Sequence, residues 1–196
     1  MSILNLTSGS GEGSYIRFMP SLNGWVFNKE EIQVKNIVMD YDTIRTGWGK
    51  MGEGVAPEWT WDEKLGVAGP QPTPEHRRGF SINLWTKATG TVEWSTTGVG
   101  PVMGFETIFT QVWDLKDANP GMVPVLQYTG SEAIKIGKGN TRKPIFTIGK
   151  WVIRSSVPWN GDEAEAEPAP AAPAPKPAPK AAAKAGGSFS VEFEDD

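Results

Sequence analysis

The sequence contains no cysteine and only one histidine, His76. Without thiols the chain can form neither disulfides nor cysteine-ligated metal sites, and this composition suits a reducing compartment. A single histidine also excludes multi-histidine metal centres and most catalytic triads that depend on histidine. We therefore expect His76 to be a solvent-exposed loop residue.

Long apolar runs are missing as well. No window of the sequence approaches the roughly 20 apolar residues that span a bilayer. The N-terminus lacks the basic stretch and apolar run of a secretory signal. We expect a soluble intracellular protein that has no membrane partner.

Charge divides the chain into two parts. Residues 1–159 carry 16 Lys/Arg against 15 Asp/Glu, whereas residues 160–196 carry 3 against 8. Residues 168–185 consist of Pro, Ala and Lys, a composition that cannot bury enough apolar surface to fold. We expect a flexible arm over 1–13, a folded domain over 14–159, a disordered linker over 160–187 and an acidic tip over 188–196.

Within the expected domain, apolar residues alternate in short segments, which predicts strands, and recur at helical spacing in one segment that begins near Pro101. The predicted elements are strands at 15–19, 25–27, 32–45, 80–85, 91–95, 123–129, 132–137 and 144–154, one helix at about 101–116, and loops over 46–79 and 137–143. This order predicts a mainly β fold, an OB-like five-stranded Greek-key barrel with the α-helix between its third and fourth strands, followed by a disordered C-terminal tail. An SH3-like barrel or a β-sandwich fits the same pattern.

Residues for catalysis are sparse. Asp40 and Asp42 lie two apart on a predicted strand and so face the same side, where two carboxylates could bind Mg²⁺. No third acidic residue or phosphate-binding element accompanies them. The glycine-rich segment 47–54 lacks the Gly-Lys-Ser/Thr ending of a phosphate loop. We therefore expect no enzymatic activity, no metal and no cofactor.

Tryptophan is abundant, and all nine lie within residues 25–159. Three of them fall in the segment 46–79, where aromatic residues alternate with cations. Proteins that bind single-stranded nucleic acid use such aromatic faces to stack bases and such cations to bind phosphates. The candidate binding residues in and beside this segment are Arg45, Trp48, Lys50, Trp59, Trp61, Arg77 and Arg78. The alternative is that these tryptophans fasten a long loop to the barrel.

A second basic segment lies near the end of the expected domain. Residues 133–154 carry six basic side chains and no acidic one. A local positive ridge in a nearly neutral domain is typical of phosphate binding, although a merely solubilising hairpin has the same composition. The candidate binding residues here are Lys135, Lys138, Arg142 and Lys143.

The acidic tip contains two phenylalanines, which purely solubilising tails avoid. An apolar anchor flanked by acids is suited to a basic-rimmed pocket on a partner, and the negative charge can compete with nucleic acid for a cationic cleft. The candidate partner-binding residues are Phe189, Phe193, Glu194, Asp195 and Asp196. The alternative is a solubility tail.

Several short motifs resemble a family of phage and prophage single-stranded-DNA-binding proteins with an OB-like core and an acidic C-terminal tail. The resemblance covers about residues 9–159 and is carried by Ile44-Arg45-Thr46-Gly47-Trp48, Ala56-Pro57-Glu58-Trp59, His76-Arg77-Arg78-Gly79-Phe80, Val123-Pro124-Val125, Gly139-Asn140-Thr141 and Pro144-Ile145-Phe146. The tail departs from the bacterial pattern, because Phe193 is followed by Glu194-Asp195-Asp196 instead of ending the chain. This departure favours a phage-specific partner.

The sequence and the resemblance together predict sequence-independent binding of single-stranded DNA in phage replication or recombination, in the cytoplasm of the bacterial host. The tip is expected to recruit replication and recombination proteins, and the oligomeric state, monomer or homo-oligomer, is left open. The main alternative is a virion or scaffold-type module whose exposed tryptophans bind protein. A carbohydrate-active or metal-dependent enzyme is a third alternative, but no acid/base pair is placed for hydrolysis.

Overall fold

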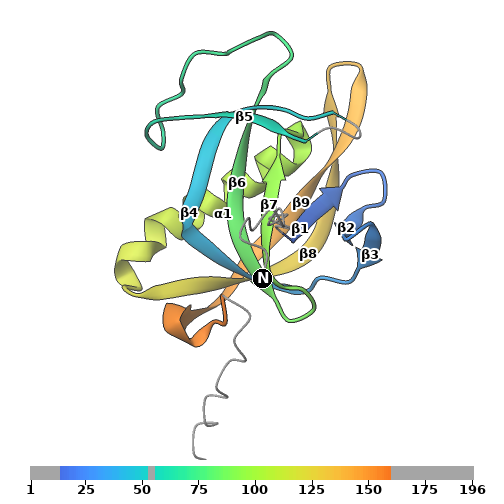
Figure 1. Cartoon of the computed structure of the whole chain (residues 1–196). Coiled ribbons are helices and arrows are strands. Elements are labelled where there is room, and N and C mark those ends of the chain that lie inside the picture. Colours follow the sequence, from blue (N-terminus) through green and yellow to red (C-terminus); the bar gives the residue numbers. More distant parts are fainter. Residues whose placement is uncertain (1–13, 53–55, 160–196) are drawn as a thin grey trace, which may run out of the picture. The chain divides into compact units, whose positions relative to one another are not determined.

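The structure, a computed structural model, describes residues 14–52 and 56–159 (Figure 1). Within this part, strands alternate with tight turns, and one helix follows the seventh strand. The elements are β1 (Tyr15–Met19), β2 (Gly24–Phe27), β3 (Glu30–Ile32), β4 (Asn36–Lys50), β5 (Glu58–Trp61), β6 (Arg77–Thr86), β7 (Gly90–Thr96), α1 (Val99–Leu115), β8 (Met122–Ile136) and β9 (Gly139–Ile153), with short 3-10 turns at Lys116–Ala118 and Arg154–Ser156.

All strands belong to one curled sheet with α1 packed against it (Figure 1). The strand order is β3-β2-β1-β7-β6-β4-β8-β9, and β5 pairs with β4. The β1–β7 pair is parallel, and the other pairs are antiparallel. The predicted mainly β fold with one helix is confirmed, but the sheet has nine strands where five were expected. No helix among the described residues is both long enough and apolar enough to cross a membrane.

Two predicted boundaries are wrong for the same physical reason, the absence of side chains on glycine. The expected loop 46–79 contains strand at three places, since β4 continues to Lys50, β5 pairs with it, and β6 begins at Arg77; residues 62–76 remain a loop. Gly47 and Gly49 face one side of β4 and hide the alternation that would have revealed the strand. The expected break between 129 and 132 is a bulge at Gly130, whose φ of 122° is open to glycine, so β8 runs through it.

The core is aromatic and lies between the sheet and α1. Trp25 and Trp94 are buried, with their ring centroids 5.1 Å apart and the rings edge to face. Trp94 also contacts Phe80 and Phe105, at 4.9 and 5.6 Å between centroids. Phe105 belongs to the apolar stripe of α1, so this contact joins the helix to the sheet. Edge-to-face pairs of this kind contribute about 0.5–1.5 kcal/mol beyond the burial of their area.

Two glycines let α1 approach the backbone of β9. A Cβ atom at Gly100 would collide with the carbonyl oxygen of Arg142, and one at Gly104 would collide with that of Pro144. The two glycines are four residues apart and therefore lie on one face of the helix. The helix thus packs on β9 at a distance that no larger residue allows.

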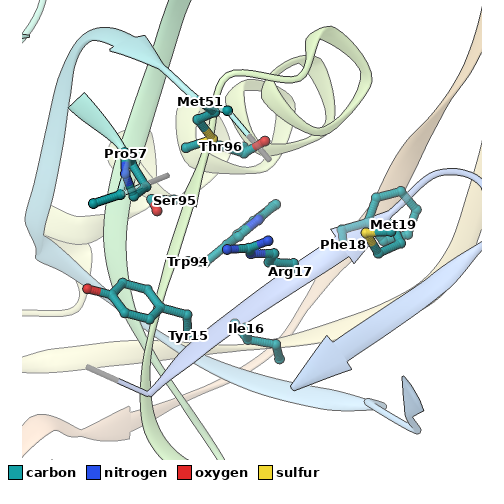
Figure 2. Close-up of a pocket in the computed structure, with 12 residues that line it drawn as sticks. Tyr15, Ile16, Arg17, Phe18, Met19, Met51, Pro57, Trp94, Ser95 and Thr96 are labelled. Carbon is teal, nitrogen blue, oxygen red and sulfur yellow. The ribbon is translucent and has the colours of Figure 1, made fainter. Parts of the chain in front are cut away.

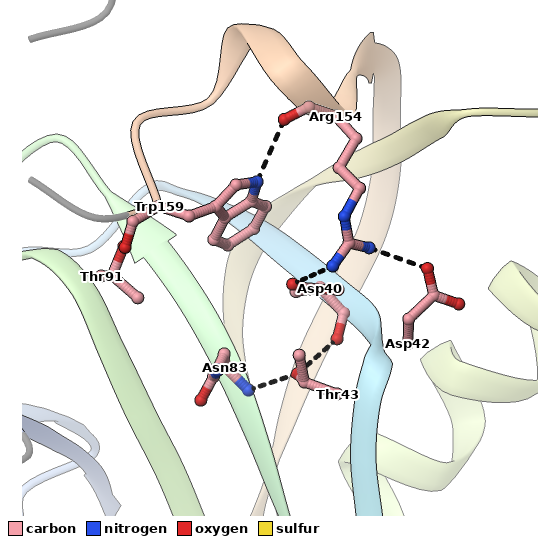
Figure 3. Close-up of polar contacts among 7 residues, drawn as sticks. All are labelled: Asp40, Asp42, Thr43, Asn83, Thr91, Arg154 and Trp159. Carbon is pink, nitrogen blue, oxygen red and sulfur yellow. Dashed lines mark hydrogen bonds and ion pairs between the residues drawn. The ribbon is translucent and has the colours of Figure 1, made fainter. Parts of the chain in front are cut away.

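The end of β9 is fastened to β4 by the guanidinium of Arg154 (Figure 3). Its Nη2 donates to Asp40 Oδ2 at 2.6 Å and its Nη1 to Asp42 Oδ2 at 2.8 Å. The indole Nε1 of Trp159 donates to the Arg154 carbonyl at 3.1 Å, and the Thr91 hydroxyl donates to the Trp159 carbonyl. Burial raises the pKa of Asp40, and Arg154 opposes that rise. These contacts hold residues 154–159 against both β4 and β7.

We predict that Gly104→Ala lowers the free energy of unfolding by about 1–3 kcal/mol, because overpacking at Pro144 outweighs the gain of roughly 1 kcal/mol in helix propensity. Urea denaturation monitored by tryptophan fluorescence measures the difference. Gln111→Ala, at an exposed position of the same helix, is the matched control and is expected to leave stability nearly unchanged. Equal stability of Gly104→Ala and the unmodified chain would contradict the close packing of α1.

Candidate nucleic-acid interface

The sheet has a face that the aromatic core does not use. Side chains alternate along each strand, so the neighbours of buried residues such as Ile16, Phe80 and Trp94 point the other way. The pairing register brings these neighbours together across β1, β7, β6, β4 and β5. We call this surface the outer face; it comprises Tyr15, Arg17, Glu93, Ser95, Arg77, Gly79, Ser81, Arg45, Gly47, Gly49, Trp59 and Trp61. The Glu93 carboxylate accepts a hydrogen bond from the Ser81 hydroxyl at 2.6 Å.

A cation and two indoles form a column on the outer face. The rings of Trp59 and Trp61 are parallel within 8°, with centroids 4.4 Å apart. The guanidinium carbon of Arg45 lies 4.4 Å from the centroid of Trp61. Trp61 pairs with Gly47 and Trp59 with Gly49, so Arg45 lies on the far side of Trp61 from Trp59. The column brings together three of the residues that the sequence analysis proposed for DNA.

Glycines form the floor of this column. A Cβ at Gly49 would come within 2.8 Å of Trp59 Cζ3, and one at Gly79 within 2.9 Å of its Cη2. A Cβ at Gly47 would lie 3.1 Å from Trp61 Cε3. The indoles therefore lie directly on the backbone of β4 and β6, which accounts for the density of glycine in these strands.

Trp48 and Arg78 face the opposite way and hold the loop 62–76. The carboxylate of Asp62, whose side chain is 2 % exposed, accepts hydrogen bonds from Arg78 Nη1 at 2.8 Å and Nη2 at 2.6 Å. It also accepts bonds from the Thr46 hydroxyl at 2.6 Å and the Gly69 amide at 3.0 Å. Trp48 Nε1 donates to the Gly69 carbonyl at 2.8 Å. These contacts match the alternative interpretation, in which a tryptophan fastens the loop to the sheet.

The environment of Asp62 favours its charged form. Hydrogen bonds from Arg78, followed by those from Thr46 and Gly69, hold the pKa of Asp62 well below its usual range in spite of burial. The positive charge of Arg78 is therefore neutralised within the domain. Lys50 is likewise paired with Glu75 in the loop. Arg77 pairs with Gly49 across β4 and β6; it is exposed and has no ion-pair partner among the described residues.

The expectation that His76 is solvent-exposed is wrong. Its side chain is 3 % exposed, and Nδ1 lies 2.8 Å from the Thr73 hydroxyl. The Gln71 amide donates to the His76 carbonyl at 2.8 Å. The loop folds back on itself just before β6 and covers the imidazole ring. The contacts come from residues three to five positions earlier in the sequence, and no periodic pattern of apolar residues marks such a turn.

Of the four predicted basic residues on the β8–β9 hairpin, two are bonded to other side chains and two are exposed without an ion pair in the part of the chain that the structure describes. The turn is shorter than the expected loop 137–143, because β9 already begins at Gly139. Arg142 donates to the Ser131 hydroxyl at 2.7 Å and to Asn23 Oδ1 at 3.0 Å, and Lys143 pairs with Glu132 at 3.3 Å. Lys135 and Lys138 are exposed and make no ion pair among the described residues. Two cations thus remain available at the hairpin tip.

Two outer-face residues, Tyr15 and Arg17, are absent from the candidates predicted from the sequence. They alternate with the buried Ile16 and Phe18 on β1, and this alternation was the available signal. Their place beside β7 could not be inferred, since it depends on parallel pairing between segments more than seventy residues apart.

The proposed partner-binding residues Phe189, Phe193, Glu194, Asp195 and Asp196 lie outside the described residues. Within residues 14–52 and 56–159, no three acidic or histidine side chains gather as metal ligands.

We predict that Asp62→Asn lowers the free energy of unfolding at pH 7 by about 1–3 kcal/mol, because Arg78 loses its carboxylate partner. The pKa of Asp62 is depressed in the folded chain, so its stabilisation is complete above the unfolded value of about 3.9 and is lost progressively as the pH falls from that value toward the depressed folded pKa. Urea denaturation at pH 7 and pH 3 measures this. The difference between the two proteins is expected to shrink at pH 3, and a constant difference would contradict the ionic role.

No protein-family model, curated protein or solved structure matches this chain.

Proposed function

We propose that the chain is a non-enzymatic, sequence-independent single-stranded-DNA-binding protein that serves phage replication or recombination. The observation that carries the proposal is the column on the outer face formed by the exposed Arg45 and the half-buried Trp61 and Trp59. Indole rings provide stacking surfaces that any base can use, and cations beside them bind phosphates. Arg77 and the hairpin residues Lys135 and Lys138 supply further positive charge that no described carboxylate neutralises.

We further propose that five strands of the curled sheet follow an OB-like order, and this order supports DNA binding. β4, β6, β7, β8 and β9 are consecutive apart from the small strand β5, and α1 lies between the third and fourth of them. β4 pairs with both β6 and β8, and β8 forms a hairpin with β9. OB folds bind oligonucleotides on the face of strands two and three and on the loops between strands one and two and strands four and five. In this chain these positions correspond to β6 and β7, to residues 51–76, and to the β8–β9 turn.

The energetics allow a base to replace Arg45 on Trp61. An exposed cation–π contact contributes about 0.5–1 kcal/mol, whereas stacking of a base on an aromatic side chain contributes about 1–3 kcal/mol. The base is therefore the stronger partner for the outer ring face of Trp61. The displaced guanidinium then remains on the same strand, next to the phosphate of the stacked nucleotide.

We predict that the chain binds oligo-dT with quenching of tryptophan fluorescence and that Trp61→Ala weakens binding by about 1–3 kcal/mol, or roughly 5- to 150-fold. Arg45→Ala is expected to flatten the dependence of log K on log[salt] by about 0.7, one phosphate contact. Trp113→Ala is the matched control, since Trp113 lies on α1 away from the outer face. Absence of quenching at low salt would contradict the proposal.

The acidic tip is proposed to recruit partner proteins and to compete with DNA for the cationic surface. This part of the proposal rests on the sequence alone, because the tip lies outside the described residues. We predict that deletion of residues 186–196 tightens oligo-dT binding at low salt, where repulsion between the tip and DNA is least screened. Fluorescence titrations at two salt concentrations measure the effect, and unchanged affinity would count against competition.

The alternative, a protein-interaction module of a virion or scaffold, is favoured by one separate observation. Leu65, Phe109 and Trp113 line a largely apolar cavity of about 530 Å³, and Trp113 is 44 % exposed. Exposed apolar surface of this kind is typical of protein contacts. The Trp113→Ala variant distinguishes the two functions, because it removes this surface and leaves the outer face intact.

A further inference from the structure

A cavity of about 340 Å³ opens beside β1 (Figure 2). Three segments that are distant in the sequence line it: β1, the residues on either side of 53–55, and the end of β7. Its volume falls within the ~300–1,000 Å³ that is usual for small-molecule sites. None of the residues that the sequence analysis proposed for DNA lines this cavity.

The side chains that line it include kinds that commonly contact nucleotides: an aromatic ring, a cation and a hydroxyl group. Tyr15 is 45 % exposed, and its phenol ring projects from β1 toward the cavity (Figure 2). Arg17, two residues further along the same face, is exposed and makes no ion pair among the described residues. The hydroxyl group of Ser95 on the paired strand β7 adds a hydrogen-bond donor and acceptor. An aromatic face, a cation and a hydroxyl thus meet at one place.

Arg17 differs from many other cations of the domain because no described carboxylate neutralises it. Arg78 is neutralised by Asp62, Lys50 by Glu75, and Arg154 by Asp40 and Asp42. An arginine on a sheet face without a carboxylate partner is available to an external anion. Its planar guanidinium suits the two oxygens of a phosphodiester.

The cavity also continues the indole column. Pro57 lines the cavity and is two residues before Trp59, which is two residues before Trp61, so the three lie along one side of the same extended segment. A strand stacked at Trp61 that follows the outer face past Trp59 therefore reaches the cavity next.

We infer that this cavity is a second nucleotide subsite, in which Tyr15 stacks one unpaired base and Arg17 binds the adjoining phosphate. The inference rests on the proposed function and extends it, since it sets the path of the single strand from Arg45 across the outer face to β1. β1 has no counterpart among the five OB-like strands, so the subsite is an addition to that binding face.

Photocrosslinking of the full chain tests the subsite. Oligo-dT in which single thymines are replaced by 5-iodouracil is bound, irradiated and digested, and the modified peptides are sequenced by mass spectrometry. A covalent adduct is expected on Tyr15, and it is expected to be lost in Tyr15→Ala. Adducts confined to Trp59, Trp61 or the β8–β9 hairpin would overturn the subsite.

The salt dependence of binding tests Arg17 separately. Arg17→Ala is expected to flatten the slope of log K against log[salt] by about 0.7, and Arg17→Lys is expected to restore it. Lys87→Ala is the matched control, because Lys87 is an exposed cation on the β6–β7 turn. Unchanged slopes for both Arg17 variants, with oligo-dT binding intact, would overturn the subsite alone. Absence of oligo-dT binding by the unmodified chain would overturn the proposed function and the subsite together.

Discussion

The outer face depends on the contact between two indoles and a backbone that carries no side chains. Trp59 and Trp61 lie on Gly47, Gly49 and Gly79, and a single methyl group at Gly49 or Gly79 would occupy the space of the Trp59 ring. The same glycines cost conformational entropy, about 0.5–1 kcal/mol each relative to alanine in a strand. Burial of the large indole surface offsets that cost, and Arg45 covers the ring face of Trp61 that Trp59 does not.

The hydrogen bonds of Asp62 stabilise the packing of the two indoles on the glycines. It follows Trp61 directly, and its carboxylate binds β4 through Thr46, β6 through Arg78 and the loop through Gly69. The strand β5 is short, and isolated short strands are marginally stable. Charge-assisted hydrogen bonds to the residue directly after this strand hold the indoles in register with their glycines. The electrostatic contact and the packing contact therefore support each other.

The distribution of ion pairs decides which cations face solvent. Several basic residues are neutralised within the domain, whereas Arg17, Arg77, Lys135 and Lys138 have no carboxylate partner among the described residues. The nine tryptophans are divided in a similar way. Trp25 and Trp94 form the core, Trp48 and Trp159 donate hydrogen bonds that fasten loops, and Trp59 and Trp61 lie on the surface. Composition alone does not separate these roles.

The sequence by itself determined the mainly β class, the single helix and the strands that become β6 and β7, because these follow from local alternation and spacing. Only the tertiary structure decided the long-range features. The parallel pairing of β1 with β7 brought Tyr15 and Arg17 to the outer face, and Asp62 took Arg78 out of the candidate interface. Strand pairing and ion pairing join residues far apart in the chain, and their energy depends on distances in space that no local pattern encodes.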